Sequence, residues 1–132
     1  MSQENVEVVR QALDAYSQRD IDTLRAIADP EIELDWSASV GWLAGIYRGF
    51  EETLRFYEGY FEAFEAIVIE ADRFIDAGES IVVPNVARQR GRDGIEVSAR
   101  STLVFTVRNR KLLGIYLYQE TEQALKAVGL EQ

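Results

Sequence analysis

The stretch IVVPNVARQRGRDGIEVSARSTLVFTVRNRKLLGIYLYQ, residues 81–119, predicts three strands in succession joined by tight turns. The expected strands are residues 81–90, 95–108 and 112–119. Between the first two, Arg92-Asp93-Gly94 is a hairpin signal, because Gly accepts the positive φ that such turns need. Consecutive hairpins of this kind indicate a sheet that is largely antiparallel.

The second turn, Asn109-Arg110, departs from the preferred pattern. A type I′ turn requires positive φ at both central residues and favours Gly at the second. If this turn is type I′, Arg110 adopts positive φ at some cost in free energy. The departure bears on stability and carries no functional information.

The residues before this run show helical and extended patterns in separate blocks. In residues 3–19, Val6, Val9, Leu13 and Tyr16 fall on one face of a helix. The other expected elements are a short helix that begins after Asp20 and ends at Pro30, a strand at 31–36, a loop at 37–48, a helix at 49–64, a strand at 66–77 and a helix at 121–128. Blocks segregated in this way indicate an α+β fold.

Length and composition limit the class of protein. The 132 residues allow one domain, residues 1–132, with one core. With 47% apolar and 28% charged residues, the chain is too apolar for disorder, and no apolar run approaches the roughly 18 residues of a membrane helix. Residues 1–5 lack the basic start and apolar stretch of a signal peptide. We therefore expect a cytoplasmic protein with no membrane partner.

The chain contains no Cys and no His. Disulfides, thiol nucleophiles, imidazole bases and Ser-His-Asp sets are therefore excluded, as are metal sites that need Cys or His. Carboxylates, Tyr and Lys remain for proton transfer. We expect no metal and no cofactor.

Three stretches together resemble the NTF2-like superfamily and, within it, the SnoaL-like proteins. They are YSQRD at 16–20 with Leu24 and Asp29-Pro30-Glu31, RQRGR at 88–92, and YQETEQALKAVGL at 118–130. The resemblance implies a cone in which a curved antiparallel β-sheet wraps around N-terminal helices and one long helix, with a pocket at the open end. It also implies a homodimer packed through the sheet. Similar proteins include ketosteroid isomerases, polyketide cyclases, epoxide hydrolases and inactive binding domains, so the fold does not select a function.

The carboxylates that this resemblance requires for catalysis are displaced here. The position of the isomerase base falls on Trp36, and alternation directs Asp35 to the opposite face of the strand. Cyclases and epoxide hydrolases need an acid on the late strands, yet residues 97–119 contain no Asp or Glu. The remaining catalytic candidates are Asp35, Asp72 and Tyr16, and a solvated or ion-paired role is the alternative for the two acids.

Aromatic side chains form the second group of candidates. Ligand sites are mostly apolar walls with a few polar groups, and Tyr hydroxyls supply such groups on rigid side chains. The expected ligand-binding residues are Tyr16, Trp36, Tyr57, Phe61, Arg88, Phe105, Tyr116 and Tyr118. Core packing is the alternative for each aromatic residue. Tyr116 and Tyr118 share a strand face beside Gly114, which favours pocket lining for this pair.

Basic residues concentrate in residues 88–111, where seven basic side chains accompany only Asp93 and Glu96. A nucleic-acid patch is disfavoured, because the rest of this chain of net charge −9 would repel phosphate. Solvated strand edges or dimer salt bridges are the preferred interpretation. Alternatively, Arg88 or Arg100 reaches the pocket and binds a carboxylate.

We therefore expect a homodimeric SnoaL-like domain that binds a hydrophobic or polycyclic molecule in an aromatic pocket. One alternative is a cofactor-free isomerase, cyclase or hydratase that acts on a lipophilic carbonyl compound with Tyr and carboxylate groups. Such an enzyme needs a carboxylate inside the pocket. The other alternative is an interaction module whose cone is filled by its own side chains. The loop at 37–48 is a candidate lid over the pocket.

Overall fold

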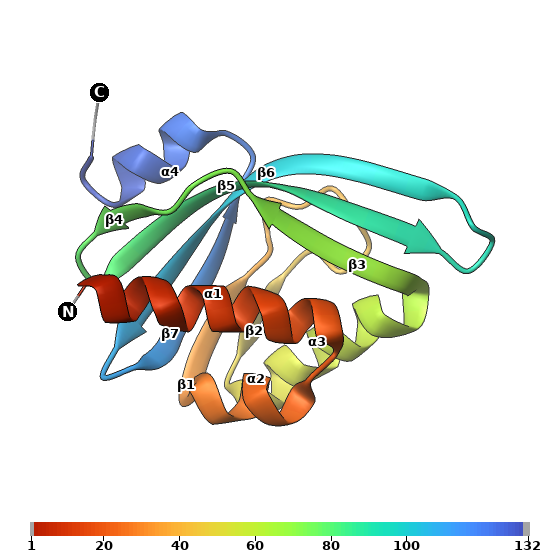
Figure 1. Cartoon of the computed structure of the whole chain (residues 1–132), viewed down its shortest axis with the longest axis horizontal. Coiled ribbons are helices and arrows are strands. Elements are labelled where there is room, and N and C mark those ends of the chain that lie inside the picture. Colours follow the sequence, from red (N-terminus) through yellow and green to blue (C-terminus); the bar gives the residue numbers. More distant parts are fainter. Residues whose placement is uncertain (1, 131–132) are drawn as a thin grey trace.

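The computed structural model describes residues 2–130 and has the α+β fold expected from the sequence (Figure 1). Its helices are α1 (Ser2–Gln18), α2 (Ile21–Ile27), α3 (Phe50–Ala63) and α4 (Thr121–Ala127). Its strands are β1 (Ala28–Asp35), β2 (Ile46–Arg48), β3 (Phe64–Ala71), β4 (Ile75–Ala77), β5 (Ser80–Gly91), β6 (Glu96–Arg108) and β7 (Lys111–Tyr118). Helices α1, α2 and α3 lie on one side of the sheet, and α4 lies on the other (Figure 1).

The sheet is mixed, with strand order β2-β1-β7-β6-β5-β3 and β4 paired to β5. The hairpins β5–β6 and β6–β7 are antiparallel, as the sequence predicts. The sheet is largely antiparallel, as expected, and the exception is the parallel pairing of β1 with β7. These two strands are joined through most of the chain, so no local turn fixes their relative direction.

Three boundaries differ from the predicted ones. Helix α2 ends at Ile27, and Pro30 lies inside β1 rather than at the end of the helix. The predicted loop at 37–48 ends in β2, which pairs with β1. The predicted strand at 66–77 is divided, because residues 72–74 separate β3 from β4.

The turn at Asn109-Arg110 has the backbone that the sequence predicts for type I′. The φ angles are +53° at Asn109 and +63° at Arg110. Both lie in the left-handed region, which Gly adopts most readily. Arg110 bears a side chain, so its positive φ costs free energy.

The main core lies between the helices and the inner face of the sheet. Alternation along β5 directs Ile81 and Val83 into this core, and both are fully buried. A second, smaller core on the outer face joins Val82 and Val104 to Leu125 of α4. Because α4 covers this end of the outer face, β5, β6 and β7 are apolar on both faces there.

Candidate functional site

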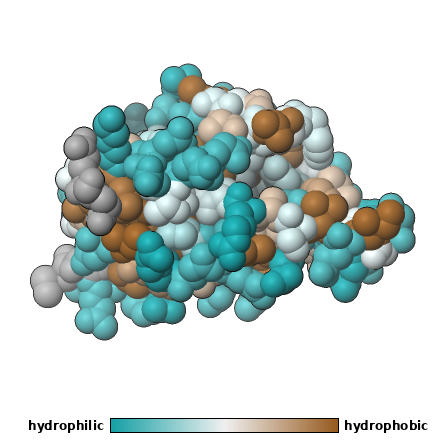
Figure 2. Space-filling view, turned by 90° about the horizontal axis from the view of Figure 1, so that it is seen from above, coloured by the Kyte–Doolittle hydropathy of each residue, from teal (hydrophilic) through white to brown (hydrophobic). Residues whose placement is uncertain are grey.

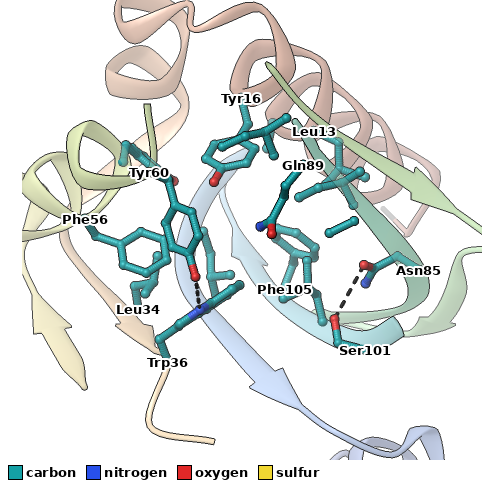
Figure 3. Close-up of a pocket in the computed structure, with 17 residues that line it drawn as sticks. Leu13, Tyr16, Leu34, Trp36, Phe56, Tyr60, Asn85, Gln89, Ser101 and Phe105 are labelled. Atoms are coloured by element: carbon teal, nitrogen blue, oxygen red, sulfur yellow. Dashed lines mark hydrogen bonds between the residues drawn. The ribbon is translucent and has the colours of Figure 1, made fainter. Parts of the chain in front are cut away.

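A cavity lies between the inner face of the sheet and helices α1 and α3 (Figure 3). Counting the space at its open mouth, it holds about 640 Å³. The part of it open to the centre of a water-sized sphere is about 70 Å³, several times what one water molecule needs, so the cavity has room for solvent or a small ligand. The helices and the end of β1 contribute mainly aromatic residues to its wall. Strands β3, β5 and β6 contribute both apolar and polar residues.

The aromatic side is built mainly by one face of α3. Phe56, Tyr57 and Tyr60 line the cavity from this helix, because helical spacing brings them to the same face. Tyr16 of α1 contacts Tyr57 with a ring-centroid distance of 5.6 Å. Trp36, which follows β1, packs edge-on against Phe56 at 5.0 Å. Offset and edge contacts of this kind hold the rings in place and leave their remaining faces toward the cavity.

The opposite side carries uncharged polar groups on β5 and β6. Asn85 is 1% exposed, and its Nδ2 donates to the carbonyl oxygen of Val83 at 2.9 Å. Ser101 faces Asn85 in the β5–β6 register, and its hydroxyl lies 3.5 Å from the Asn85 Oδ1. Gln89 lies two inward positions along β5, and its carboxamide has no hydrogen-bond partner within residues 2–130. The Tyr16 hydroxyl and the Gln89 carboxamide point into the same space (Figure 3).

The hydroxyls of Tyr16 and Tyr57 in the cavity are protonated at neutral pH. Burial raises the pKa of Tyr16 well above its ordinary value, and the neighbouring Tyr60 and Tyr57 raise it further. Burial alone raises the pKa of Tyr57. Both side chains are therefore neutral hydrogen-bond donors. Among residues 2–130, no Asp, Glu, Lys or Arg lines the cavity.

Four of the eight expected ligand-binding residues line the cavity: Tyr16, Trp36, Tyr57 and Phe105. Phe61 is on the same helix as Tyr57 but lies outside the lining. Its ring packs against Tyr16 at 5.4 Å, and its residue is 9% exposed. Phe61 therefore packs against the aromatic lining without itself facing the cavity.

Arg88, Tyr116 and Tyr118 project from the outer face of the sheet and do not line the cavity. The guanidinium of Arg88 donates from Nε to Glu70 at 2.8 Å, so in this structure the arginine is paired away from the cavity. Tyr116 and Tyr118 pack against the small core beneath α4. They do share a strand face, as predicted, but it is the face opposite the cavity.

The two candidate acids also lie outside the cavity. Asp35 accepts hydrogen bonds from the Ser37 backbone N–H at 3.0 Å and the Ser37 hydroxyl at 2.6 Å. Asp72 forms an ion pair with Arg100 at 3.1 Å. The alternative interpretation for both acids, a solvated or paired role, fits these contacts.

The prediction from sequence did not include Asn85, Gln89 or Ser101. A signal for the first two was present, because they have the same parity along β5 as Ile81 and Val83. A polar residue at an inward-facing position of a buried strand is the informative exception to look for. Tyr60, which also lines the cavity, is likewise absent from the expected site residues.

The arginines of residues 88–111 are mostly paired within the chain. Arg90 lies 3.5 Å from Glu65, Arg108 lies 3.2 Å from Glu79, and Arg110 lies 3.2 Å from Glu4. These pairs join strands and connect the β6–β7 turn to α1. The cluster is thus a set of solvent-exposed intramolecular ion pairs.

No helix within residues 2–130 is long and apolar enough to cross a membrane. No group of three or more Asp or Glu side chains in the described residues is arranged to hold a metal ion.

Known structures share this fold over nearly the whole chain. An NTF2-like protein of unknown function from Burkholderia pseudomallei superposes with a TM-score of 0.77, at 21% identity over 96% of this chain and 98% of that chain. A putative SnoaL-like polyketide cyclase from Jannaschia gives 0.76, at 15% identity over 99% and 95%. TerC co-crystallized with polyporic acid gives 0.77, at 16% identity over 95% and 98%. These likenesses show the NTF2-like fold.

Comparison of the sequence identifies one family within this fold. Among curated proteins, none matches the chain. The model of the SnoaL-like domain matches residues 9–115, which includes every strand from β1 to β6 and most of β7. The chain therefore belongs to the SnoaL-like domain family.

Proposed function

We propose that the chain binds a small, uncharged, largely apolar ring compound in the cavity between α1, α3 and the sheet. The observation that carries this proposal is the pairing of an aromatic wall with an uncharged polar wall and no charged lining residue among residues 2–130. The aromatic rings contact the flat faces of the ligand. Gln89 and the Tyr16 hydroxyl hydrogen-bond to its oxygen or nitrogen atoms.

The absence of charge in the described lining favours a neutral ligand. A charged ligand that enters the cavity loses its hydration, and this loss costs several kcal/mol unless an opposite charge offsets it. Desolvation of neutral carbonyl or hydroxyl groups costs less free energy, because carboxamides and phenols replace the lost water contacts. Carboxylate recognition by Arg88 is not proposed, because that guanidinium lies on the other face with Glu70.

The aromatic side favours a flat ligand. Tyr16, Trp36, Tyr57 and Phe105 line one continuous space. Rigid rings contact flat molecules over a large area at little cost in conformational entropy. TerC, which has the same fold, was co-crystallized with polyporic acid.

Binding is favoured over carboxylate-dependent catalysis. A general base must lie within hydrogen-bond reach of the proton it removes. Asp35 and Asp72 lie outside the cavity, and Asp35 is hydrogen-bonded to Ser37. The open cavity also disfavours the interaction module, whose cone would be filled by side chains.

The proposal is tested by thermal unfolding of the purified chain in the presence of defined probes. The probes are a steroid ketone, an anthraquinone and a terpenoid ketone, with an aromatic carboxylic acid as the charged comparison. A ligand present at 100 times its Kd stabilises the folded state by about 2.7 kcal/mol. For a domain of this size we expect neutral ring probes to raise Tm by about 5–10 °C and the acid to have no effect. No shift with any neutral probe, or a larger shift with the acid, would contradict the proposal.

A matched pair of variants locates the binding. Gln89→Leu removes a cavity-facing carboxamide that has no partner within residues 2–130, so the fold should be retained. Arg88→Gln changes the neighbouring residue on the opposite face and serves as the control. We expect Gln89→Leu to weaken binding of a ketone probe about 5- to 20-fold, as loss of one hydrogen bond predicts, and Arg88→Gln to leave it unchanged. Equal effects of the two variants would place the probe elsewhere.

A further inference from the structure

Asn85 occupies an inward-facing position in the middle of β5. The same row of inward positions includes Val83, which is fully buried, and Ala87, which lines the cavity. Asn is depleted in strands, and burial of a carboxamide costs free energy unless its polar groups are hydrogen-bonded. Asn85 is nonetheless buried in this row. Packing alone favours an apolar residue at this position, so the carboxamide indicates a role in the cavity.

The carboxamide of Asn85 has hydrogen-bonding capacity that residues 2–130 leave unused. A carboxamide donates up to two hydrogen bonds from its nitrogen and accepts up to two at its oxygen. Nδ2 donates one hydrogen bond, to the carbonyl oxygen of Val83 at 2.9 Å. Oδ1 accepts from the Ser101 hydroxyl at 3.5 Å, which is long for a hydrogen bond between two oxygen atoms. One N–H and most of the acceptor capacity are therefore available to a ligand.

Ser101 adds a second polar group beside Asn85. The two residues face each other in the β5–β6 register, and both line the cavity. A serine hydroxyl rotates, so it donates or accepts according to its partner. Asn85 and Ser101 together present a donor and an acceptor to one part of the cavity, which we call the Asn85/Ser101 subsite.

The Asn85/Ser101 subsite is separate from the Gln89 carboxamide. Asn85 and Gln89 lie four positions apart on β5, so their Cα atoms are about 13 Å apart at about 3.3 Å per residue. Figure 3 shows Tyr16 and Gln89 together at one part of the wall and Asn85 with Ser101 at another. Both groups nevertheless line the same cavity.

The wall between these two polar regions is apolar. Ala87 occupies the inward position between Asn85 and Gln89 on β5. It pairs with Ile69 of β3, and both residues line the cavity. Along β5 the wall therefore changes from polar to apolar and back to polar.

We propose that Asn85 and Ser101 bind a hydroxyl group of the ligand, so that the ligand carries a polar group at each end of an apolar ring body. This inference rests on the proposed function, because it concerns the same cavity. The ligand hydroxyl donates to the Asn85 Oδ1 and accepts from the free Nδ2–H or from Ser101. The other end of the ligand hydrogen-bonds to Gln89 and Tyr16. The spacing along β5 suits a body of roughly two or three fused rings.

The Asn85/Ser101 subsite selects a hydroxyl over a ketone. A ketone oxygen accepts hydrogen bonds and donates none, so beside Asn85 it would leave Oδ1 without a short donor contact. A buried acceptor without a donor costs free energy. A ligand with one hydroxyl and one carbonyl therefore binds in one direction, with the carbonyl toward Gln89 and Tyr16.

The first experiment compares three neutral naphthols by calorimetric titration of the full chain at neutral pH. Naphthalene-2,6-diol has a hydroxyl at each end, naphthalene-2,3-diol has both hydroxyls at one end, and 2-naphthol has one hydroxyl. We expect the 2,6-diol to bind about 5- to 20-fold more tightly than the other two, because it alone reaches both polar regions. Equal affinities of the two diols would overturn the second subsite.

The outcomes separate this inference from the proposed function. If all three compounds bind with the same Kd, the cavity takes ring compounds and the assignment of Asn85 and Ser101 is wrong. If none of the three binds, the proposed function is wrong, and this inference is overturned with it.

Substitutions test the subsite itself. Asn85→Leu fills the same space without hydrogen-bonding groups, so we expect the 2,6-diol to be preferred over 2-naphthol by less than about twofold. Affinity for 2-naphthol, which binds at Gln89, should change little. Ser101→Ala should lower the preference about two- to fivefold, and it tests the same point if Asn85→Leu does not fold.

Ser98→Ala is the matched control for Ser101→Ala. Ser98 is exposed and lies on the opposite face of β6, because an odd number of positions separates it from Ser101. This variant should keep the full preference for the 2,6-diol. If Asn85→Leu and Ser101→Ala lower Tm and leave the ratio of the two affinities unchanged, the pair has a purely structural role and the proposal is wrong.

Discussion

The indole nitrogen of Trp36 donates a hydrogen bond to the hydroxyl of Tyr60 at 3.3 Å. This contact joins the end of β1 to the middle of α3 at the cavity wall (Figure 3). Tyr60 also stacks with the exposed ring of Trp42, at a centroid distance of 6.2 Å. One tyrosine thus connects the cavity lining to the loop between β1 and β2.

Tyr60→Phe is expected to remove this hydrogen bond and keep the ring contacts. Because the acceptor is neutral and half-buried, we expect a loss of about 0.5–1 kcal/mol in the free energy of unfolding, measured by urea denaturation. The emission of Trp36 should also change. Tyr118→Phe, on the outer face, is the control and should have no effect on either quantity. A stability loss above about 2 kcal/mol would indicate that the ring has moved.

Alkaline pH is expected to destabilise the fold through the buried tyrosines. Burial raises the pKa of Tyr16 and Tyr57 above the ordinary value of 10.0. Above that pH the unfolded chain loses these protons while the folded chain keeps them. The folded state then binds more protons, so the free energy of unfolding falls as pH rises. Each tyrosine contributes a slope of up to about 1.4 kcal/mol per pH unit.

Denaturation with urea between pH 8 and pH 11.5 measures this slope. Stability should change little below the ordinary tyrosine pKa and then decline. Tyr16→Phe should reduce the slope, because the substituted residue has no proton to lose. An unchanged slope in both Tyr16→Phe and Tyr57→Phe would show that other groups cause the alkaline loss.

Arg19 is expected to stabilise the junction of α3 and β3. Its guanidinium donates to the carbonyls of Phe61, Phe64 and Glu65, and it lies 5.1 Å from the centre of the Phe61 ring. Arg19→Ala should lower the free energy of unfolding by about 1–3 kcal/mol. Arg19→Lys should recover little, because one ammonium group cannot reproduce the planar fork.

The control for this pair is Arg55→Ala, which removes an exposed arginine of α3. Its effect should stay within about 0.5 kcal/mol. If Arg19→Lys were as stable as the wild type, the positive charge alone, and not the planar guanidinium, would account for the stabilisation.

The backbone at Arg110 predicts a stabilising substitution. Arg110→Gly relieves a φ of +63°, which costs a side-chain-bearing residue roughly 1–2 kcal/mol. The variant also loses the exposed pair with Glu4, worth about 0–1 kcal/mol. We expect a net gain of about 0.5–1 kcal/mol in thermal unfolding. Arg110→Gln keeps the strain and loses the pair, so it should be neutral or slightly destabilised.

Local chemistry explains which parts of the fold were predictable. The turns at Arg92-Asp93-Gly94 and Asn109-Arg110 fix their hairpins through neighbouring residues, so the sequence predicts them. The parallel pairing of β1 with β7 depends on contacts between distant residues. No pattern within either strand specifies its neighbour.

The site was predictable only where one strand face is clearly apolar. Trp36 follows the buried Ile32 and Leu34 in alternation, and it lines the cavity as expected. In β7 both faces are apolar because α4 covers the outer one, so alternation did not assign Tyr116. In β5, alternation separates Gln89 from Arg88, but the ability of a guanidinium to bind a carboxylate ligand favoured the arginine.

Filling the cavity with a larger side chain tests where a ligand binds. Ala87 lines it from β5 and faces Ile69 and Ala99 in the neighbouring strands. Ala87→Phe places a ring in open space instead of a packed core, so we expect a change in stability below about 1.5 kcal/mol. The same ring occupies the volume proposed for the ligand, so thermal shifts with neutral probes should disappear. Val86→Phe adds an equal ring on the outer face and should keep those shifts. Probe binding that survives Ala87→Phe would mean that the ligand lies outside this cavity.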